Sequence, residues 1–144
     1  MRKDCIAVIG LGNIAARHRK NLKQIFPKAP ILAVATRMYR PSFVPDYCDE
    51  ILGSLDELLS RHIRFVVVAS PAPFHIVHAL PFIEAGIPVL IEKPVAASVQ
   101  DAERLLKKCL DFDLVRNYLS ETRNFLRWIL LHNLLLASAH PEND

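Results

Sequence analysis

The chain has 144 residues, of which 51% are hydrophobic and 23% charged, and its formal net charge is +3. This composition is typical of one globular domain with a substantial core and excludes a disordered chain. The basic residues are dispersed, which argues against nucleic acid or an anionic membrane as a partner. The three cysteines lie far apart without a CxxC pair, so we expect neither a disulfide framework nor a metal site. The short apolar run near the N-terminus does not fit a signal peptide, and we expect a cytoplasmic protein.

The first predicted element is a buried strand that runs directly into a glycine-containing turn. Residues 5–9 are apolar and β-rich, which suits a strand buried on both faces of a parallel sheet. A Gly-x-Gly-x-x-Ala motif follows at residues 10–15. Gly10 permits a tight turn, Gly12 lets a pyrophosphate approach the backbone, and Ala15 allows close packing of a helix on the strand. The motif predicts dinucleotide binding at the helix N-terminus, the alternative being a plain strand–helix turn.

We predict the first helix over residues 15–26, ended by Pro27. Its apolar face is predicted to contain Ile14, His18, Leu22 and Ile25 or Phe26. Arg17 and Arg19 lie off this face. We interpret both as part of a solvated basic surface, the alternative being contact with a phosphate.

The end of the second strand, predicted over residues 31–36, indicates which dinucleotide binds. NAD-binding folds usually place an acidic residue there to hold the ribose hydroxyls. This chain has Arg37, with Arg40 close behind. A guanidinium can pair with a 2′-phosphate through two hydrogen bonds, so we favour NADP over NAD. The alternative is that Arg37 is simply the first exposed residue after the strand.

The middle of the chain continues the alternation of strands and helices. A proline-rich loop over residues 41–47 precedes a short edge strand over residues 49–52. Ser54 is the predicted N-cap of a helix over residues 55–61, with Glu57 completing a capping box. A buried strand follows over residues 64–69. This order predicts an α/β fold, a doubly wound Rossmann-type parallel sheet with helices on both faces.

The loop after that strand, Ser70-Pro71-Ala72-Pro73-Phe74, should face the cofactor, because ligands bind at the carboxyl edge of an open parallel sheet. His75 opens the next predicted helix, which runs to about residue 85, contains Pro81 and stops at Gly86. His75 could act as an acid or base, but its position favours packing or capping. We expect His78 to be structural.

The last predicted strand, residues 87–91, ends in Glu92-Lys93-Pro94. A carboxylate and an ammonium at the end of a buried strand cost desolvation free energy unless they meet ligand or solvent. Pro94 restricts Lys93 to an extended conformation. The pair is therefore the strongest chemical candidate in the chain, the alternative being a surface ion pair. A further helix is expected over residues 99–110, capped by Ser98.

The ordered set of these motifs resembles the Gfo/Idh/MocA oxidoreductases, the relatives of glucose–fructose oxidoreductase, inositol dehydrogenase and rhizopine catabolism proteins. The resemblance covers residues 5–109 and rests on the turn of residues 10–15, on Ser70-Pro71 with His75, and on residues 85–94. It implies reversible hydride transfer between NAD(P) and a hydroxyl or carbonyl of a sugar, polyol or related small molecule.

The resemblance also implies which residues bind the cofactor: Gly10, Gly12, Asn13, Ile14, Arg37, Ser70, Pro71, His75, Glu92 and Lys93. The first four would hold the pyrophosphate and Arg37 the adenosine end, while Ser70, Pro71 and His75 would line the groove. Glu92 and Lys93 would lie by the nicotinamide ribose, with Lys93 reaching the reacting oxygen as the catalytic residue. A cation there stabilises developing alkoxide charge and assists proton transfer.

The chain departs from the family near residue 110. We predict residues 1–110 as the NAD(P)-binding Rossmann domain and residues 111–144 as an atypical helical, hydrophobic tail, which we interpret as a truncation or frameshift in place of the substrate domain. The apolar run of residues 126–137 is too short and interrupted for a membrane span. It would bury itself on the sheet or in a second subunit, the latter giving a homo-oligomer.

Two hypotheses about function therefore stay open. The chain is the cofactor domain of an oxidoreductase, or it is a nucleotide-binding module or inactive remnant without turnover of its own. For the isolated chain the second is favoured, because hydride transfer needs the substrate held closely against the nicotinamide.

Overall fold

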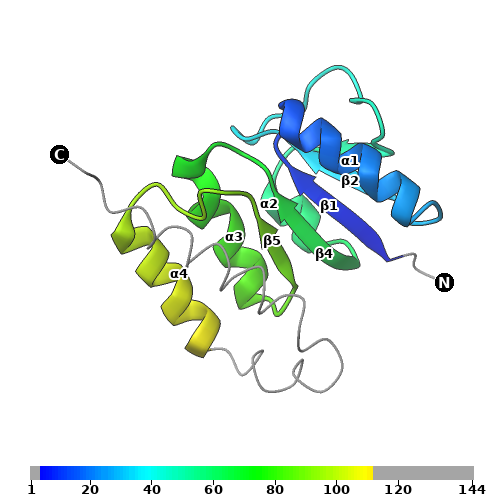
Figure 1. Ribbon diagram of the computed structural model, residues 1–144. Coiled ribbons are helices and arrows are strands. Elements are labelled where there is room, and N and C mark those ends of the chain that lie inside the picture. The colour runs from blue at the N-terminus through cyan, green and yellow to red at the C-terminus, as the bar shows by residue number, and fades with distance from the viewer. Residues whose placement is uncertain (1–3, 112–144) are drawn as a thin grey trace.

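The computed structural model describes residues 4–111 of the chain (Figure 1). The predicted tail therefore lies outside the described residues from residue 112 on. The elements are, in chain order, β1 (Cys5–Ile9), α1 (Asn13–Ile25), β2 (Ile31–Val34), β3 (Glu50–Leu52), α2 (Leu55–Leu59), β4 (Ile63–Val68), the 3₁₀ helix η1 (Ala72–Phe74), α3 (His75–Glu84), β5 (Val89–Ile91) and α4 (Val99–Asp111). Every strand and helix predicted up to residue 110 is present, with ends shifted by a few residues.

The five strands form one sheet in the order β3-β2-β1-β4-β5, and all neighbours are parallel. Parallel pairing explains the strand sequences, because β1 and β2 must be apolar on both faces. From β1 the chain builds outward first on one side, to β3, and then on the other, to β5. The order reverses between β1 and β4, which is where ligands bind in open α/β sheets. The predicted fold class is confirmed.

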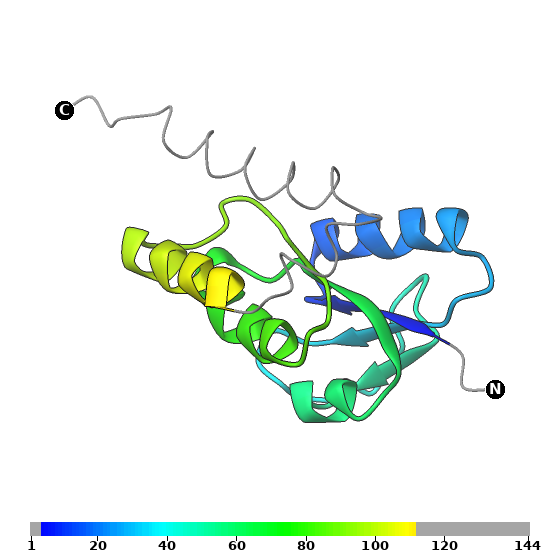
Figure 2. The ribbon, with the colours of Figure 1, turned by 90° about the horizontal axis from the view of Figure 1, so that it is seen from below.

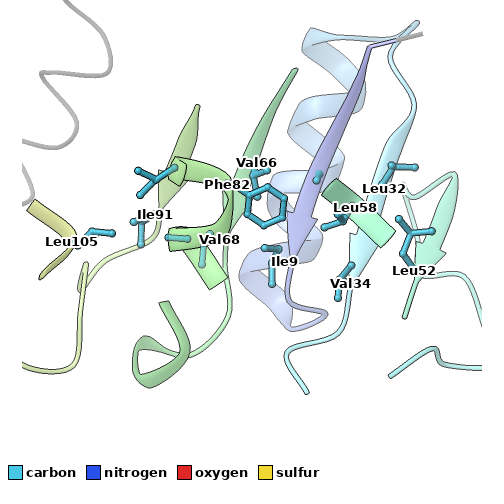
Figure 3. Close-up of a cluster of buried hydrophobic side chains, with 13 residues drawn as sticks. Ile9, Leu32, Val34, Leu52, Leu58, Val66, Val68, Phe82, Ile91 and Leu105 are labelled. Atoms are coloured by element: carbon cyan, nitrogen blue, oxygen red, sulfur yellow. The ribbon is translucent and has the colours of Figure 1, made fainter. Parts of the chain in front are cut away.

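Helices cover both faces of the sheet (Figure 2). On one face, α1 packs over Ile6, Val8, Ile31 and Val67. On the other face α2 and α3 pack over the alternate residues of the same strands, and Figure 3 shows this larger cluster. Phe82 of α3 lies at its centre, and Leu105 brings α4 into the same cluster. Burying an aromatic side chain such as Phe82 contributes about 1.5–3 kcal/mol, so this layer is a principal source of stability.

The buried face of α1 differs from the predicted one. It consists of Ala15, Arg19 and Leu22, whereas Ile14 and Ile25 are 48% and 66% exposed. The prediction is right for Leu22 and, of its alternatives Ile25 and Phe26, for Phe26, which packs against the same cluster. It is wrong for Ile14, and it does not include Ala15 and Arg19. Close contact of Ala15 with the sheet fixes the rotation of α1, and residues spaced by three or four positions from it follow onto the buried side.

Two predicted helix ends are confirmed. The Ser54 hydroxyl accepts a hydrogen bond from the Glu57 N–H at 3.1 Å, and Gly86 has a φ of +74° after α3. The Glu57 carboxylate, however, accepts from Gly53 N at 3.3 Å rather than from the N-cap itself, so the capping box is displaced by one residue. None of the helices among residues 4–111 combines the length and apolar character that crossing a membrane requires.

Candidate functional site at the carboxyl edge of the sheet

The predicted site segments follow the carboxyl ends of four neighbouring strands. Backbone hydrogen bonds join them in a row, since Gly10 N donates to Val34 O, Ala69 N to Ile9 O, and Glu92 N to Val68 O. The glycine turn, the Ser70-Pro71 loop and the Glu92-Lys93-Pro94 segment therefore leave the sheet at one edge. Arg37 leaves it at the same edge, after β2.

The two glycines of the turn differ in what a side chain would meet at each position. Gly10 has a φ of +113°, and a Cβ there would lie 2.6 Å from Ala69 O and 2.9 Å from Ala69 C. It is required both by its backbone conformation and by the close approach of the β4 end. At Gly12 a Cβ would meet no atom within 4 Å. That position is open on the side from which a ligand would approach.

The N-terminus of α1 fits an anionic group. Gly12 is its N-cap, no side chain caps the first turn, and that turn contains no acidic residue. The first hydrogen bond of the helix runs from Ala16 N to Gly12 O. The N–H groups of the three preceding residues, Asn13 among them, have no partner within the helix and can bind a pyrophosphate.

A buried cation lies beneath this turn. Arg19 is 2% exposed, and its guanidinium donates to Asp46 O at 3.0 Å and to Gly10 O at 3.4 Å. Burial lowers the pKa of Arg19, while Cys48 and Asp46 act in the opposite direction. Arginine remains charged at neutral pH. The prediction of a solvated Arg19 is therefore wrong, because the side chain ties the turn to the loop before β3.

The cations after β2 differ in how they are engaged. Arg40 pairs with Glu57 at 2.5 Å, and that carboxylate also holds Gly53 N. Arg37 is exposed, and within residues 4–111 its side chain has no hydrogen-bond or ion-pair partner. Arg37 is thus the guanidinium that remains available to a ligand at this end of the edge.

The loop after β4 is held by two buried histidines of α3. His75 is 1% exposed, and its ring nitrogens lie 2.5 Å from Ser70 O and 2.9 Å from Pro94 O. A neutral imidazole can donate to only one of these carbonyl oxygens, and an imidazolium to both. His75 therefore joins the ends of β4 and β5, which is the packing role favoured from the sequence.

His78 has a comparable bridging role. Its Nδ1 lies 2.8 Å from Ser70 Oγ, and its ring also bonds the Thr36 backbone. Burial lowers the pKa of His78, the Thr36 hydrogen bond opposes this, and nearby His75 adds to it. The Ser70 side chain is consequently buried and occupied, whereas Pro71 is exposed at the edge.

The segment after β5 presents Lys93 to solvent. Lys93 is exposed, and the Lys93–Pro94 peptide bond is cis. Glu92 is not paired with the Lys93 ammonium. Its Oε2 accepts from Lys93 N at 3.3 Å, and its Oε1 lies 2.5 Å from His18 Nε2 of α1. The alternative of a surface ion pair between Glu92 and Lys93 is therefore not observed among residues 4–111: the Glu92 carboxylate contacts His18, and Lys93 is exposed.

The segments that carry the predicted residues therefore leave the sheet at one edge. Three side chains that the sequence did not assign to this edge contact those segments: His18 contacts Glu92, Arg19 contacts Gly10, and His78 contacts Ser70. Among residues 4–111, no group of three or more His, Cys, Asp or Glu side chains is placed to hold a metal ion.

Comparison with known proteins identifies the same fold as the structure. Residues 5–113 match the GFO_IDH_MocA family, described as an oxidoreductase family with an NAD-binding Rossmann fold. Inositol 2-dehydrogenase of Leifsonia xyli is 30% identical over 107 residues, covering 71% of this chain and 31% of that protein. The 2,7-anhydro-N-acetylneuraminate hydratase of Mediterraneibacter gnavus is 27% identical over 110 residues, covering 76% and 29%.

Among solved structures, GenD2 from gentamicin A biosynthesis, in complex with NAD, matches with a TM-score of 0.60. It is 28% identical, and the match covers 77% of this chain and 32% of that one. The chain thus spans about a third of the length of the curated relatives it matches.

Proposed function

This chain belongs to the Gfo/Idh/MocA oxidoreductase family, as its NAD-binding Rossmann domain, and we propose that it serves hydride transfer between a nicotinamide dinucleotide and a hydroxyl or carbonyl of a sugar, polyol or related small molecule. One observation carries the proposal: an uncapped helix N-terminus behind Gly12 and an exposed Lys93 leave the sheet at the same edge. A relative named as an inositol dehydrogenase and a neighbour that holds NAD support this chemistry.

The residues divide the work along that edge. The N–H groups at Asn13 and Ile14 bind the pyrophosphate, with Gly12 leaving room for it. Pro71 and the backbone at Ser70 form the wall of the groove next to β4. The bound nicotinamide supplies the hydride that moves to or from the substrate carbon. As a carbonyl oxygen gains negative charge during reduction, the Lys93 ammonium stabilises it and donates a proton.

Saturable binding of NADPH or NADH by the chain, followed by nucleotide fluorescence, tests the cofactor part of the proposal. Reduction of a panel of ketoses and inosose-type ketones, followed by NADPH absorbance, tests the reaction. Binding without any absorbance change would support the second candidate, a nucleotide-binding module without turnover.

NADP is the dinucleotide that we propose, on the strength of Arg37. Its guanidinium has no partner among residues 4–111 and can form charge-assisted hydrogen bonds with a 2′-phosphate, whereas Arg40 is held by Glu57. Arg37→Ala should weaken NADPH binding about 10- to 100-fold and leave NADH binding within about 3-fold. Arg40→Ala is the matched control and should change neither affinity by more than about 3-fold. Equal losses of NADPH and NADH binding in Arg37→Ala would refute the phosphate role.

The domain division is also part of the proposal. We propose residues 1–110 as the dinucleotide-binding domain and residues 111–144 as a separate segment of hydrophobic sequence. Self-association through residues 126–137 and a cytoplasmic location remain predictions from composition. The genomic sequence downstream tests the frameshift interpretation: family-like codons in another reading frame support it, and their absence overturns it.

A further inference from the structure

The contact between His18 and Glu92 joins two parts of the groove that are distant in sequence. His18 lies in the second turn of α1, the helix whose N-terminus faces the phosphates, and Glu92 directly follows β5. His18 Nε2 and Glu92 Oε1 are 2.5 Å apart across 74 residues of sequence. Of the side-chain hydrogen bonds within residues 4–111, this one alone joins α1 to the segment after β5.

The sheet order shows why such a contact matters. α1 packs mainly on β1 and β2 and reaches Val67 of β4, whereas β5 is the outermost strand on that side, beyond β4. The segment that carries Lys93 therefore leaves an edge strand of only three residues. A side chain that reaches from α1 to this segment fixes the lysine relative to the phosphate-binding turn.

Glu92 transmits the constraint because both of its oxygens are used. While Oε1 contacts His18, Oε2 accepts from the backbone N–H of Lys93 at 3.3 Å. An ordinary exposed ion pair is worth little, but this carboxylate is about two-thirds buried and bound at both oxygens. Its orientation is coupled to the backbone from which the Lys93 ammonium projects.

We propose that His18 is a positioning residue: through Glu92 it sets the placement of Lys93 against the nicotinamide end of the dinucleotide. The inference rests on the proposed function. It requires that loss of His18 weaken interactions at the nicotinamide end while leaving the adenosine–pyrophosphate end unaffected.

The test compares NADPH with ADP, which carries a pyrophosphate but no nicotinamide ribose. His18→Ala should weaken NADPH binding about 3- to 10-fold, as expected for loss of one hydrogen bond, and leave ADP binding within about 2-fold. His18→Gln, whose amide nitrogen can replace Nε2 as a donor, should restore NADPH binding. The fluorescence emission of bound NADPH at saturation should change in the alanine variant and return in the glutamine variant.

Two controls separate positioning from general destabilisation. Lys23→Ala removes another side-chain contact of α1, with Asp49 at the far end of the helix, and should change neither affinity. Combining His18→Ala with Glu92→Gln should add little to either single change, because both act through one contact. Thermal unfolding of every variant identifies any that fail to fold. If His18→Ala does not fold, the binding of NADPH and ADP by His18→Gln is compared with that of the original chain instead.

Equal weakening of NADPH and ADP in His18→Ala, no weakening of either, or failure of a folded His18→Gln variant to recover NADPH binding would overturn the inference. Binding of neither ligand by the unaltered chain would instead overturn the proposed function, and this inference with it.

Discussion

Exchanging each glycine of the phosphate turn for alanine should produce opposite effects on stability and binding. At Gly10 an added Cβ meets backbone atoms at 2.6 and 2.9 Å, and the residue has a φ of +113°. Backbone strain costs about 1–3 kcal/mol and overpacking about another 1–3 kcal/mol. Gly10→Ala should therefore lower the free energy of unfolding by roughly 2–6 kcal/mol, a large part of a typical domain's stability.

At Gly12 the expectation reverses. Its φ of −72° suits any residue, and no atom lies within 4 Å of an added Cβ. The stability of Gly12→Ala should stay within about 1 kcal/mol of the original chain. The methyl group would occupy the space through which the pyrophosphate approaches. Losing one backbone hydrogen bond to that charged group weakens binding by about 10- to 100-fold.

Urea unfolding and NADPH titration of both variants provide the assay. With an m-value of about 2 kcal/mol/M, the Gly10→Ala midpoint should fall by about 1–3 M, and that of Gly12→Ala should hardly move. An unchanged midpoint in Gly10→Ala would refute the steric reasoning. Undiminished NADPH affinity in Gly12→Ala would refute the assignment of the cradle.

Two further predictions concern buried ionisable groups. Arg19→Met removes the hydrogen-bond donors to the Gly10 and Asp46 carbonyl oxygens and should lower the free energy of unfolding in urea by about 1–3 kcal/mol. The control Arg17→Met, at an exposed position, should change it by less than about 0.5 kcal/mol. Equal effects of the two changes would contradict a buried anchoring role for Arg19. The pKa of His78 is lower in the folded chain than the ordinary histidine value of about 6.5. Just below that pH the unfolded chain therefore binds more protons than the folded chain, and the stability present above about pH 6.5 is lost as the pH falls. Between about pH 7 and about pH 5, the free energy of unfolding should decline less in His78→Asn than in the original chain. Parallel pH profiles for the two proteins would contradict this.

The sheet and the turn could be predicted because their signals are local. Continuous apolar runs such as Phe65-Val66-Val67-Val68 identify buried parallel strands. The spacing of the glycine motif itself indicates a tight turn at Gly10 and open space for a ligand at Gly12. Parallel topology then placed the loop ends at one edge without any knowledge of side-chain contacts.

The orientation of α1 was mispredicted although a usable signal was present. The glycine motif predicts close packing of Ala15 against the strand, and positions three and four residues apart share a helix face. Arg19 lies four residues after Ala15, and Leu22 three residues after Arg19. Hydrophobicity alone favoured Ile14 over this series, because a buried arginine contradicts the ordinary pattern.

Other contacts at the site had no local signal. His18 and Glu92 are 74 residues apart, and neither sequence neighbourhood indicates the other. The bridging of Ser70 and Pro94 by His75 likewise depends on how α3 docks under the sheet edge. Such contacts follow from tertiary packing, which one sequence does not specify.

The histidine bridges of α3 have a consequence for how such a domain can be reused. His75 and His78 fasten the ends of β2, β4 and β5 to one helix, so the platform that carries Lys93 should move as a single piece. Relatives whose sequences match this domain carry names as different as inositol 2-dehydrogenase and 2,7-anhydro-N-acetylneuraminate hydratase. A rigid dinucleotide-binding platform can be combined with different substrate-binding segments. The reaction can then change with those segments while the dinucleotide-binding residues stay the same.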